Sequence, residues 1–196
     1  MFTGIIQHSG VFKGFRLGKR EMVVEAATIP AQTGPGESIN VDGVCLSLVR
    51  RENKLLFFNL SQETLKTTTL GALRQGALLN LELPLTLASP LGGHLATGHV
   101  DFASKVLRVI PRKPGRRLAV FLPGKFRPYF IPKGSVALNG VSLTIASLQP
   151  SVFEVELIPV TLEKSNLAGL KAGDRVNIEC DMIGKYVYNW ITQGNR

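Results

Sequence analysis

The sequence predicts an all-β protein in which one small domain occurs twice, and three observations predict it. The segment GESINVDGVCLSL at residues 36–48 returns 97 positions later as KGSVALNGVSLTI at residues 133–145. The same offset aligns residues 64–82 with 161–179, where seven of nineteen positions are identical. Short apolar runs are separated by turn residues at the spacing of an antiparallel barrel or sandwich. A period of 97 residues is far longer than the roughly 20–50 residues of solenoid repeats, so each copy is a domain.

The apolar runs of the first copy define its expected strands. They cover residues 4–11, 21–26, 38–41, 44–49, 55–60 and 78–83. Asp42-Gly43 lies between the third and fourth runs, and Asn139-Gly140 lies between the corresponding runs of the second copy. These dipeptides favour two-residue hairpin turns because both of their residues tolerate positive φ. Each copy is therefore expected to centre on a tight β-hairpin.

A short helix is expected after the fifth strand of each copy. In residues 61–73, Ser61 is a suitable N-cap, and Gly71 or Gly76 ends the helix. Residues 158–170 have the same shape, with Pro159 near the start. We expect these helices to close the barrels rather than to form a domain of their own.

The boundary between the two copies is expected in residues 84–93, where Pro and Gly cluster. Thr3-Gly4 recurs as Thr97-Gly98 only 94 positions later, so the second copy has three more residues between this dipeptide and its hairpin. We therefore predict one barrel at residues 1–88, a second at 89–181, and a C-terminal helix with its tail at 182–196.

The predicted C-terminal helix carries one apolar face. Its apolar side chains recur at helical spacing, at Ile183, Tyr186, Val187, Trp190 and Ile191. This face needs a surface to cover it. Another subunit and the protein's own barrel are both open at this point, and the first would make the helix an oligomerisation element.

Composition limits the class of protein. With 44% hydrophobic and 19% charged residues the chain is not disordered. No signal peptide and no membrane-spanning segment are recognised, and Cys45 and Cys180 are expected to be free thiols, which together predict a cytoplasmic protein.

The net charge of +9 invites a nucleic-acid interpretation, but the basic stretches 13–20 and 111–117 lack the interleaved aromatic residues of a stacking platform. We favour solvated loops.

Common catalytic motifs are missing from the sequence, which contains no P-loop, GxGxxG, HExxH or paired CxxC. His94 and His99 are five residues apart, and on one strand they would lie on opposite faces, so no shared metal is expected. The two copies differ at three notable pairs, which are Cys45/Ser142, Ile5/His99 and Gly36/Lys133. Each difference also has a structural interpretation, as a core cysteine, a hydrogen-bonded histidine and a turn lysine.

The ordered motifs of the chain resemble the riboflavin synthase family. They are MFTGIIQ, GESINVDGVCLSL, ETLKTTTLG, GGHLATGHVD, KGSVALNGVSLT, LIPVTLE and VNIECD, and they extend from Met1 to about Tyr186. The resemblance implies two tandem six-stranded Greek-key antiparallel barrels, each of which holds one 6,7-dimethyl-8-ribityllumazine. The implied reaction transfers a four-carbon unit between two lumazines and yields riboflavin and 5-amino-6-(D-ribitylamino)uracil. It needs no cofactor and no metal. A homotrimer is implied, and an association with lumazine synthase stays open.

The resemblance also assigns site residues. The catalytic candidates are His99, Cys45, Ser142 and Asp181. The substrate-binding candidates are Phe2, Thr3, Gly4, Ser38, Ser47, Thr68, Gly98, Lys133, Thr144 and Ile158. The C7 methyl group of the lumazine is acidic, so a base such as His99 can assist removal of its proton. Hydroxyl groups can orient the ring, and Cys45 can act by hydrogen bonding or as a nucleophile. We place His99, Lys133 and Asp181 near Ser142 in the second barrel.

Two departures and two rival functions accompany this interpretation. Val160 replaces the Glu or His that the family usually has in LIPxTLE, and the chain ends at Arg196, earlier than many relatives. One rival is a non-catalytic lumazine protein built from the same duplicated barrel, and the other is a basic barrel that binds nucleic acid. Because polar residues are present in both hairpin motifs and in GGHLATGH, we favour the enzyme.

Overall fold

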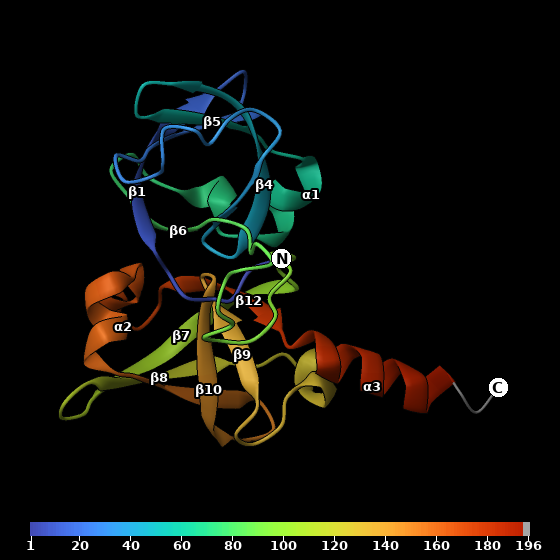
Figure 1. Ribbon diagram of the computed structural model, residues 1–196. Coiled ribbons are helices and arrows are strands. Elements are labelled where there is room, and N and C mark those ends of the chain that lie inside the picture. The colour runs from blue at the N-terminus through green and yellow to red at the C-terminus, as the bar shows by residue number, and fades with distance from the viewer. Residues whose placement is uncertain (194–196) are drawn as a thin grey trace.

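The computed structural model describes residues 1–193 and contains two closed six-stranded antiparallel barrels (Figure 1). The first barrel has strand order β1-β2-β5-β4-β3-β6, and the second repeats it as β7-β8-β11-β10-β9-β12. In each barrel the second strand pairs with the fifth instead of the third, which is a Greek-key crossing. The predicted fold class, an all-β duplicated barrel with a short C-terminal helix, is therefore confirmed.

The elements of the two barrels correspond one to one. The first barrel contains β1 (His8–Arg16), β2 (Glu21–Glu25), β3 (Ser38–Val41), β4 (Val44–Glu52), β5 (Leu55–Asn59), α1 (Gln62–Thr67), η1 (Leu70–Ala72) and β6 (Leu78–Glu82). The second contains β7 (Phe102–Pro111), β8 (Arg116–Phe121), η2 (Gly124–Tyr129), β9 (Ser135–Leu138), β10 (Val141–Leu148), β11 (Val152–Leu157), α2 (Pro159–Lys164), η3 (Asn166–Gly169) and β12 (Arg175–Cys180). The helix α3 (Met182–Gln193) follows.

Both predicted hairpins are present. Val41 pairs with Val44 across Asp42-Gly43, and Leu138 pairs with Val141 across Asn139-Gly140. All four turn residues have positive φ, between 44° and 86°, as two-residue hairpin turns require. The tips of the two hairpins meet, since a Cβ on Gly43 would lie 2.9 Å from the backbone nitrogen of Gly140. Each barrel therefore contacts the other through its central hairpin.

The first strand starts later than predicted. The sequence pattern predicts a strand at residues 4–11, but β1 begins at His8. The preceding residues leave the first barrel, and Ile6, which is 7% exposed, packs into the core of the second. Val100 packs in return against the core of the first barrel. Burial in the opposite barrel thus outweighs continuation of the strand.

Asparagine side chains fix the two barrels relative to each other. Asn80 Nδ2 donates to the carbonyl of Asn139 at 2.9 Å, and Asn177 Nδ2 donates to the carbonyl of Asp42 at 2.8 Å. Each asparagine also accepts a backbone N–H from the other barrel, from Asn166 and Thr69 respectively, at 2.7 Å. The contacts are reciprocal, so an approximate two-fold axis relates the barrels.

The C-terminal helix projects from the second barrel (Figure 1). Its inner side packs on η2, where the rings of Tyr188 and Tyr129 meet edge to face at 5.4 Å. The predicted apolar stripe is exposed, between 52% and 79% for its five members. Packing of this stripe on its own barrel, which the sequence left open, is therefore wrong. Residues 194–196 of the predicted tail lie outside the described residues.

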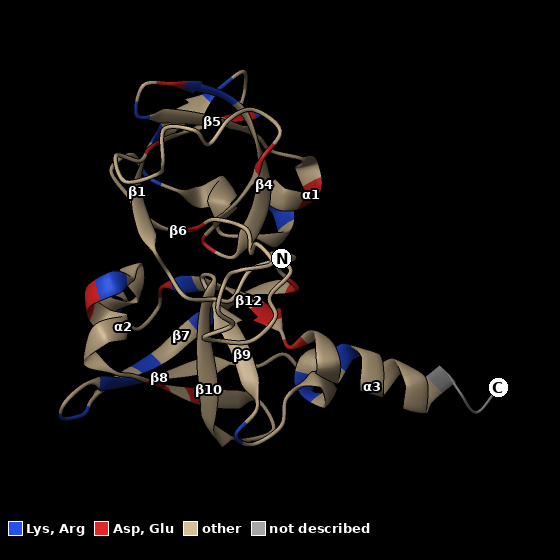
Figure 2. Cartoon of the chain, in the orientation of Figure 1, with Lys and Arg blue, Asp and Glu red and all other residues tan. Residues whose placement is uncertain are grey.

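The basic residues are dispersed and the two cysteines are unpaired. Lys and Arg are spread over both barrels in the view of Figure 2. Several are paired, as Arg117 is with Glu154 and Glu156. Cys45 and Cys180 are free thiols, as expected. None of the helices within residues 1–193 combines the length and hydropathy that a membrane crossing requires.

Candidate functional site

Each barrel presents a polar wall on the outer side of its hairpin. On β4 the side chains of Val44, Leu46 and Leu48 are buried, whereas Cys45 and Ser47 point to the outer face. Ser38 lies opposite Ser47 on β3. We call Ser38, Cys45 and Ser47 the first wall.

The second barrel repeats this wall. Ser142 and Thr144 point outward from β10, and Ser135 lies opposite Thr144 on β9. We call Ser135, Ser142 and Thr144 the second wall. The alternation of strand side chains explains why the predicted polar residues of each hairpin share a face.

A Thr-Gly segment from the opposite barrel completes each wall. The backbone N–H of Cys45 donates to the carbonyl of Gly98, and that of Ser142 donates to the carbonyl of Gly4, both at 2.8 Å. A Cβ on either glycine would lie 2.6 Å from the Cβ of Cys45 or Ser142, and both glycines have positive φ. Glycine is required here because any side chain would separate the segment from the wall. Both walls are therefore composite, with residues from both barrels.

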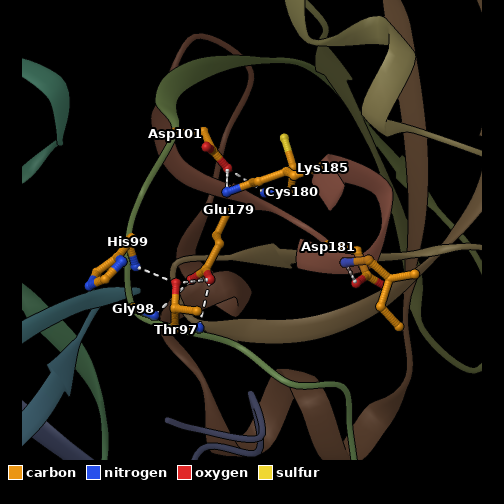
Figure 3. Close-up of polar contacts among 9 residues, drawn as sticks. Thr97, Gly98, His99, Asp101, Glu179, Cys180, Asp181 and Lys185 are labelled. Carbon is orange, nitrogen blue, oxygen red and sulfur yellow. Dashed lines mark hydrogen bonds and ion pairs between the residues drawn. The ribbon is translucent and has the colours of Figure 1, made fainter. Parts of the chain in front are cut away.

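A buried carboxylate holds each Thr-Gly segment in place. Glu179 Oε1 accepts the backbone N–H and the hydroxyl of Thr97, both at 2.7 Å, and its Oε2 accepts the N–H of Gly98 at 3.0 Å (Figure 3). Glu82 binds Thr3 and Gly4 with the same three bonds. Burial raises the pKa of Glu82, and these hydrogen bonds oppose the rise. The Thr3 hydroxyl thus holds the loop through Glu82, and substrate binding by Thr3 stays a prediction.

His99 lies next to the first wall. It follows Gly98, whose carbonyl binds Cys45, and its side chain is exposed. In Figure 3 its ring points away from Asp101 and Lys185. A hollow of about 630 Å³ between this segment and α3 is lined by Thr97, His99 and Asp101 among others. Our placement of His99 beside Ser142 was wrong, because the segments cross over and Ile5 takes that position.

Asp101 connects the His99 segment to the C-terminal helix. Its Oδ2 accepts the N–H of Cys180 at 2.8 Å and the ammonium group of Lys185 at 2.6 Å (Figure 3). The pKa of the Cys180 thiol is raised, mainly by burial and to a smaller extent by the negative charge of Asp101. Cys180 is therefore a neutral core residue and not a nucleophile.

Ser142 of the second wall has a histidine partner that the sequence did not predict. His94 is 9% exposed, and its Nδ1 lies 2.7 Å from Ser142 Oγ. Burial lowers the pKa of this ring, and the nearby carboxylates of Asp181 and Glu179 oppose that shift. His94 and His99 do not share a strand, so the argument from strand faces does not apply to them. Residues 1–193 contain no group of three or more His, Cys, Asp or Glu residues suited to a metal.

The remaining predicted site residues differ in their surroundings. Phe2 is completely buried, and the Thr68 hydroxyl binds the carbonyl of Thr64 at 2.7 Å, so both stabilise the fold. Lys133 and Ile158 are exposed. Asp181 Oδ1 accepts the N–H of Ile183 at 3.0 Å at the start of α3.

Two similar barrels with outward polar walls, each completed by the other barrel, define a duplicated barrel protein with two equivalent candidate binding surfaces. Comparison with known proteins agrees. A family model described as the lumazine binding domain matches residues 3–84 and again 97–181. The chain belongs to this lumazine-binding family, the family of the riboflavin synthases.

The similar curated proteins are named riboflavin synthase. The chain is 37% identical to the riboflavin synthase of Mycobacterium bovis, over 95% of this chain and 96% of that protein. It is 32% identical to the riboflavin synthase of Bacillus subtilis, over 100% of this chain and 92% of that protein.

Solved structures share the fold. A structure of LumP with 6,7-dimethyl-8-(1'-D-ribityl) lumazine has a TM-score of 0.81 at 22% identity, over 92% of this chain and 99% of that one. A LumP complex with riboflavin has a TM-score of 0.83 at 23% identity with the same coverage.

Proposed function

We propose that this protein is a riboflavin synthase that converts two molecules of 6,7-dimethyl-8-ribityllumazine into riboflavin and 5-amino-6-(D-ribitylamino)uracil. The observation that carries the proposal is a pair of walls with the same shape and different chemical groups. Cys45 and His99 belong to the first wall and its completing segment, whereas Ser142 and Ile5 hold the equivalent positions at the second. Two copies of one substrate need two like sites, and unlike reactivity needs unlike groups.

The proposed reaction suits this arrangement. Together the two products contain the atoms of two lumazines, so no oxidant or reductant is needed. Binding two substrates in fixed orientation is the largest source of acceleration. His99 can accept a proton from the C7 methyl of a lumazine on the first wall, which adds about 10²- to 10⁴-fold for general base catalysis. Ser47, Thr144 and Lys133 are exposed and free to bind the polar ring atoms.

We also propose that the lumazines meet between subunits of a homotrimer. The exposed apolar stripe of α3 supports this, because five large apolar side chains on one helix face favour burial against another chain. A cytoplasmic location, and an association with lumazine synthase in the cell, would suit an enzyme of this pathway step. Light scattering at micromolar concentration should give a mass near three times 21.3 kDa.

The decisive assay is incubation of the purified protein with 6,7-dimethyl-8-ribityllumazine. We expect riboflavin absorbance to rise while two lumazines disappear for each riboflavin formed. The rival that a specific observation favours is a lumazine-binding protein without catalysis, given the fold shared with LumP. Tight lumazine binding without riboflavin formation would establish that rival and refute the enzyme.

A further inference from the structure

His94 contacts the second wall from the segment that joins the two barrels. The Ser142 hydroxyl has a histidine partner there, whereas no hydrogen bond within residues 1–193 joins the Cys45 side chain to a histidine. This difference is additional to the three that the sequence shows.

The local backbone holds His94 close to Ser142. The N–H of His94 donates to the carbonyl of Thr3 at 3.2 Å. This bond attaches the linker to the Thr3-Gly4 segment, which completes the second wall. A Cβ on Gly93 would lie 2.1 Å from that carbonyl oxygen and 2.9 Å from the Cβ of Ser142. Only glycine leaves room for the linker to pass here, and this passage puts Nδ1 at 2.7 Å from the hydroxyl.

The other ring nitrogen of His94 is the stronger sign of a functional role. Nε2 is buried and has no hydrogen-bond partner among the described residues. A buried polar atom without a partner is costly, so native proteins rarely keep one without a reason. Because burial lowers the pKa of the ring, His94 is neutral near pH 7. A neutral imidazole has one donor and one acceptor nitrogen, so its tautomer sets the direction of the Ser142 hydroxyl proton.

We propose that His94 is a positioning residue of the second wall, which fixes the Ser142 hydroxyl against the lumazine bound there. The inference rests on the proposed function and deepens it, because it gives the second site a hydrogen-bonding group of fixed direction. His94 acts through Ser142, whose hydroxyl lies 2.7 Å from Nδ1 and belongs to the outward-facing side of β10.

A double-mutant cycle tests the inference. The variants are His94→Leu, Ser142→Ala and the double variant, with turnover, lumazine affinity and unfolding midpoint measured for each. Loss of a neutral hydrogen bond at the reacting ring should reduce turnover about 10-fold in either single variant. If His94 acts through Ser142, the double variant should be no slower than the slower single variant. His94→Asn, which can place a polar atom where Nδ1 lies, should recover turnover to within about 2-fold.

A second histidine provides the matched control. His8 Nδ1 lies 3.2 Å from the Thr28 hydroxyl, which repeats the histidine–hydroxyl pair away from both walls. His8→Leu should leave turnover unchanged. Exchange of the lumazine C7 methyl protons for deuterium, followed by NMR, reports on proton removal separately from the transfer step.

The outcomes separate the two proposals. Additive losses in the cycle, or full activity of His94→Leu, would overturn the positioning role while the wild type still made riboflavin. A wild type that binds lumazine without making riboflavin would overturn the proposed function. In that case, non-additive changes in lumazine affinity across the cycle would still support a role of the His94–Ser142 pair in binding lumazine. Additive changes would overturn that role.

Discussion

Replacement of Asp42 by asparagine should make the stability of this protein less sensitive to pH. Asp42 is 3% exposed at the tip of the first hairpin, where it meets the second barrel. Its Oδ1 accepts the backbone N–H of Asn80 at 2.7 Å and the amide of Asn166 at 2.9 Å. Burial outweighs these bonds and raises the pKa of Asp42 from 3.8 to about 7. The equivalent residue in the second hairpin is Asn139, which is already neutral.

The sign and size follow from linkage. Because the folded pKa is raised, the stabilising contribution is complete below pH 3.8 and is lost as the pH rises through about 7. One pKa unit corresponds to about 1.4 kcal/mol, so the full loss is about 4 kcal/mol. Between pH 5 and pH 8 the wild type should lose about 2 to 3 kcal/mol relative to Asp42→Asn. The asparagine amide that replaces the acid hydroxyl costs about 1 to 3 kcal/mol at every pH if it finds no acceptor.

Urea unfolding of both proteins at several pH values measures this difference. The free energy of unfolding of Asp42→Asn minus that of the wild type should grow by about 2 to 3 kcal/mol from pH 5 to pH 8. Asn139→Asp is the mirror variant, and it should lose stability over the same range because it adds a second buried carboxyl. Parallel curves for the wild type and Asp42→Asn would refute the reasoning, since Asp42 would then titrate alike in both states.

Three further variants test the site and the assembly. Glu179→Gln weakens the hydrogen bonds that hold Thr97 and Gly98, so turnover should fall about 10-fold or more. Glu63→Gln, which changes an exposed carboxylate on α1, is the control. Equal turnover of the Glu179→Gln and Glu63→Gln variants would contradict a role of Glu179 in holding the Thr-Gly segment. His99→Ala should reduce turnover by about 10²-fold with lumazine binding retained, and unchanged turnover would remove it as the base. Trp190→Glu places a charge on the exposed stripe of α3 and should give a monomer by light scattering; a trimer of this variant would remove the stripe as the contact.

The sequence predicted what depends on local pattern and on the repeat. The positions of the hairpins at Asp42-Gly43 and Asn139-Gly140, the two short helices and the composition of both walls follow from turn chemistry and strand alternation. It did not predict that Ile6 and Val100 exchange barrels, because the apolar run 4–11 is equally compatible with a longer strand. That exchange is why His99 lies near the first wall.

His94 shows a different limit of sequence analysis. Its contact with Ser142 requires the linker to fold back across the second barrel, which no local pattern encodes. The signal that could have indicated it is Gly92-Gly93 directly before the histidine, since paired glycines often mark a close backbone approach. The bond from the Thr68 hydroxyl to the carbonyl of Thr64 shows a similar limit, because the sequence does not reveal that this hydroxyl closes α1.

The distribution of differences between the two halves argues for unequal roles of the walls. The parts that hold the halves together are nearly identical, down to equal bond lengths from Glu82 and Glu179 to their Thr-Gly segments. Differences also occur at and next to the walls, where Cys45 faces Ser142 and Gly36 faces Lys133 in the alignment, and one of them has a cost. Lys133 has φ of 66° where the first copy has Gly36 at 89°, and a non-glycine residue in that conformation costs about 1 kcal/mol. Under the proposed reaction the two lumazines have unequal roles, because one must give up the carbons that the other receives. Different groups at the equivalent wall positions, Cys45 and Ser142, suit such unequal roles.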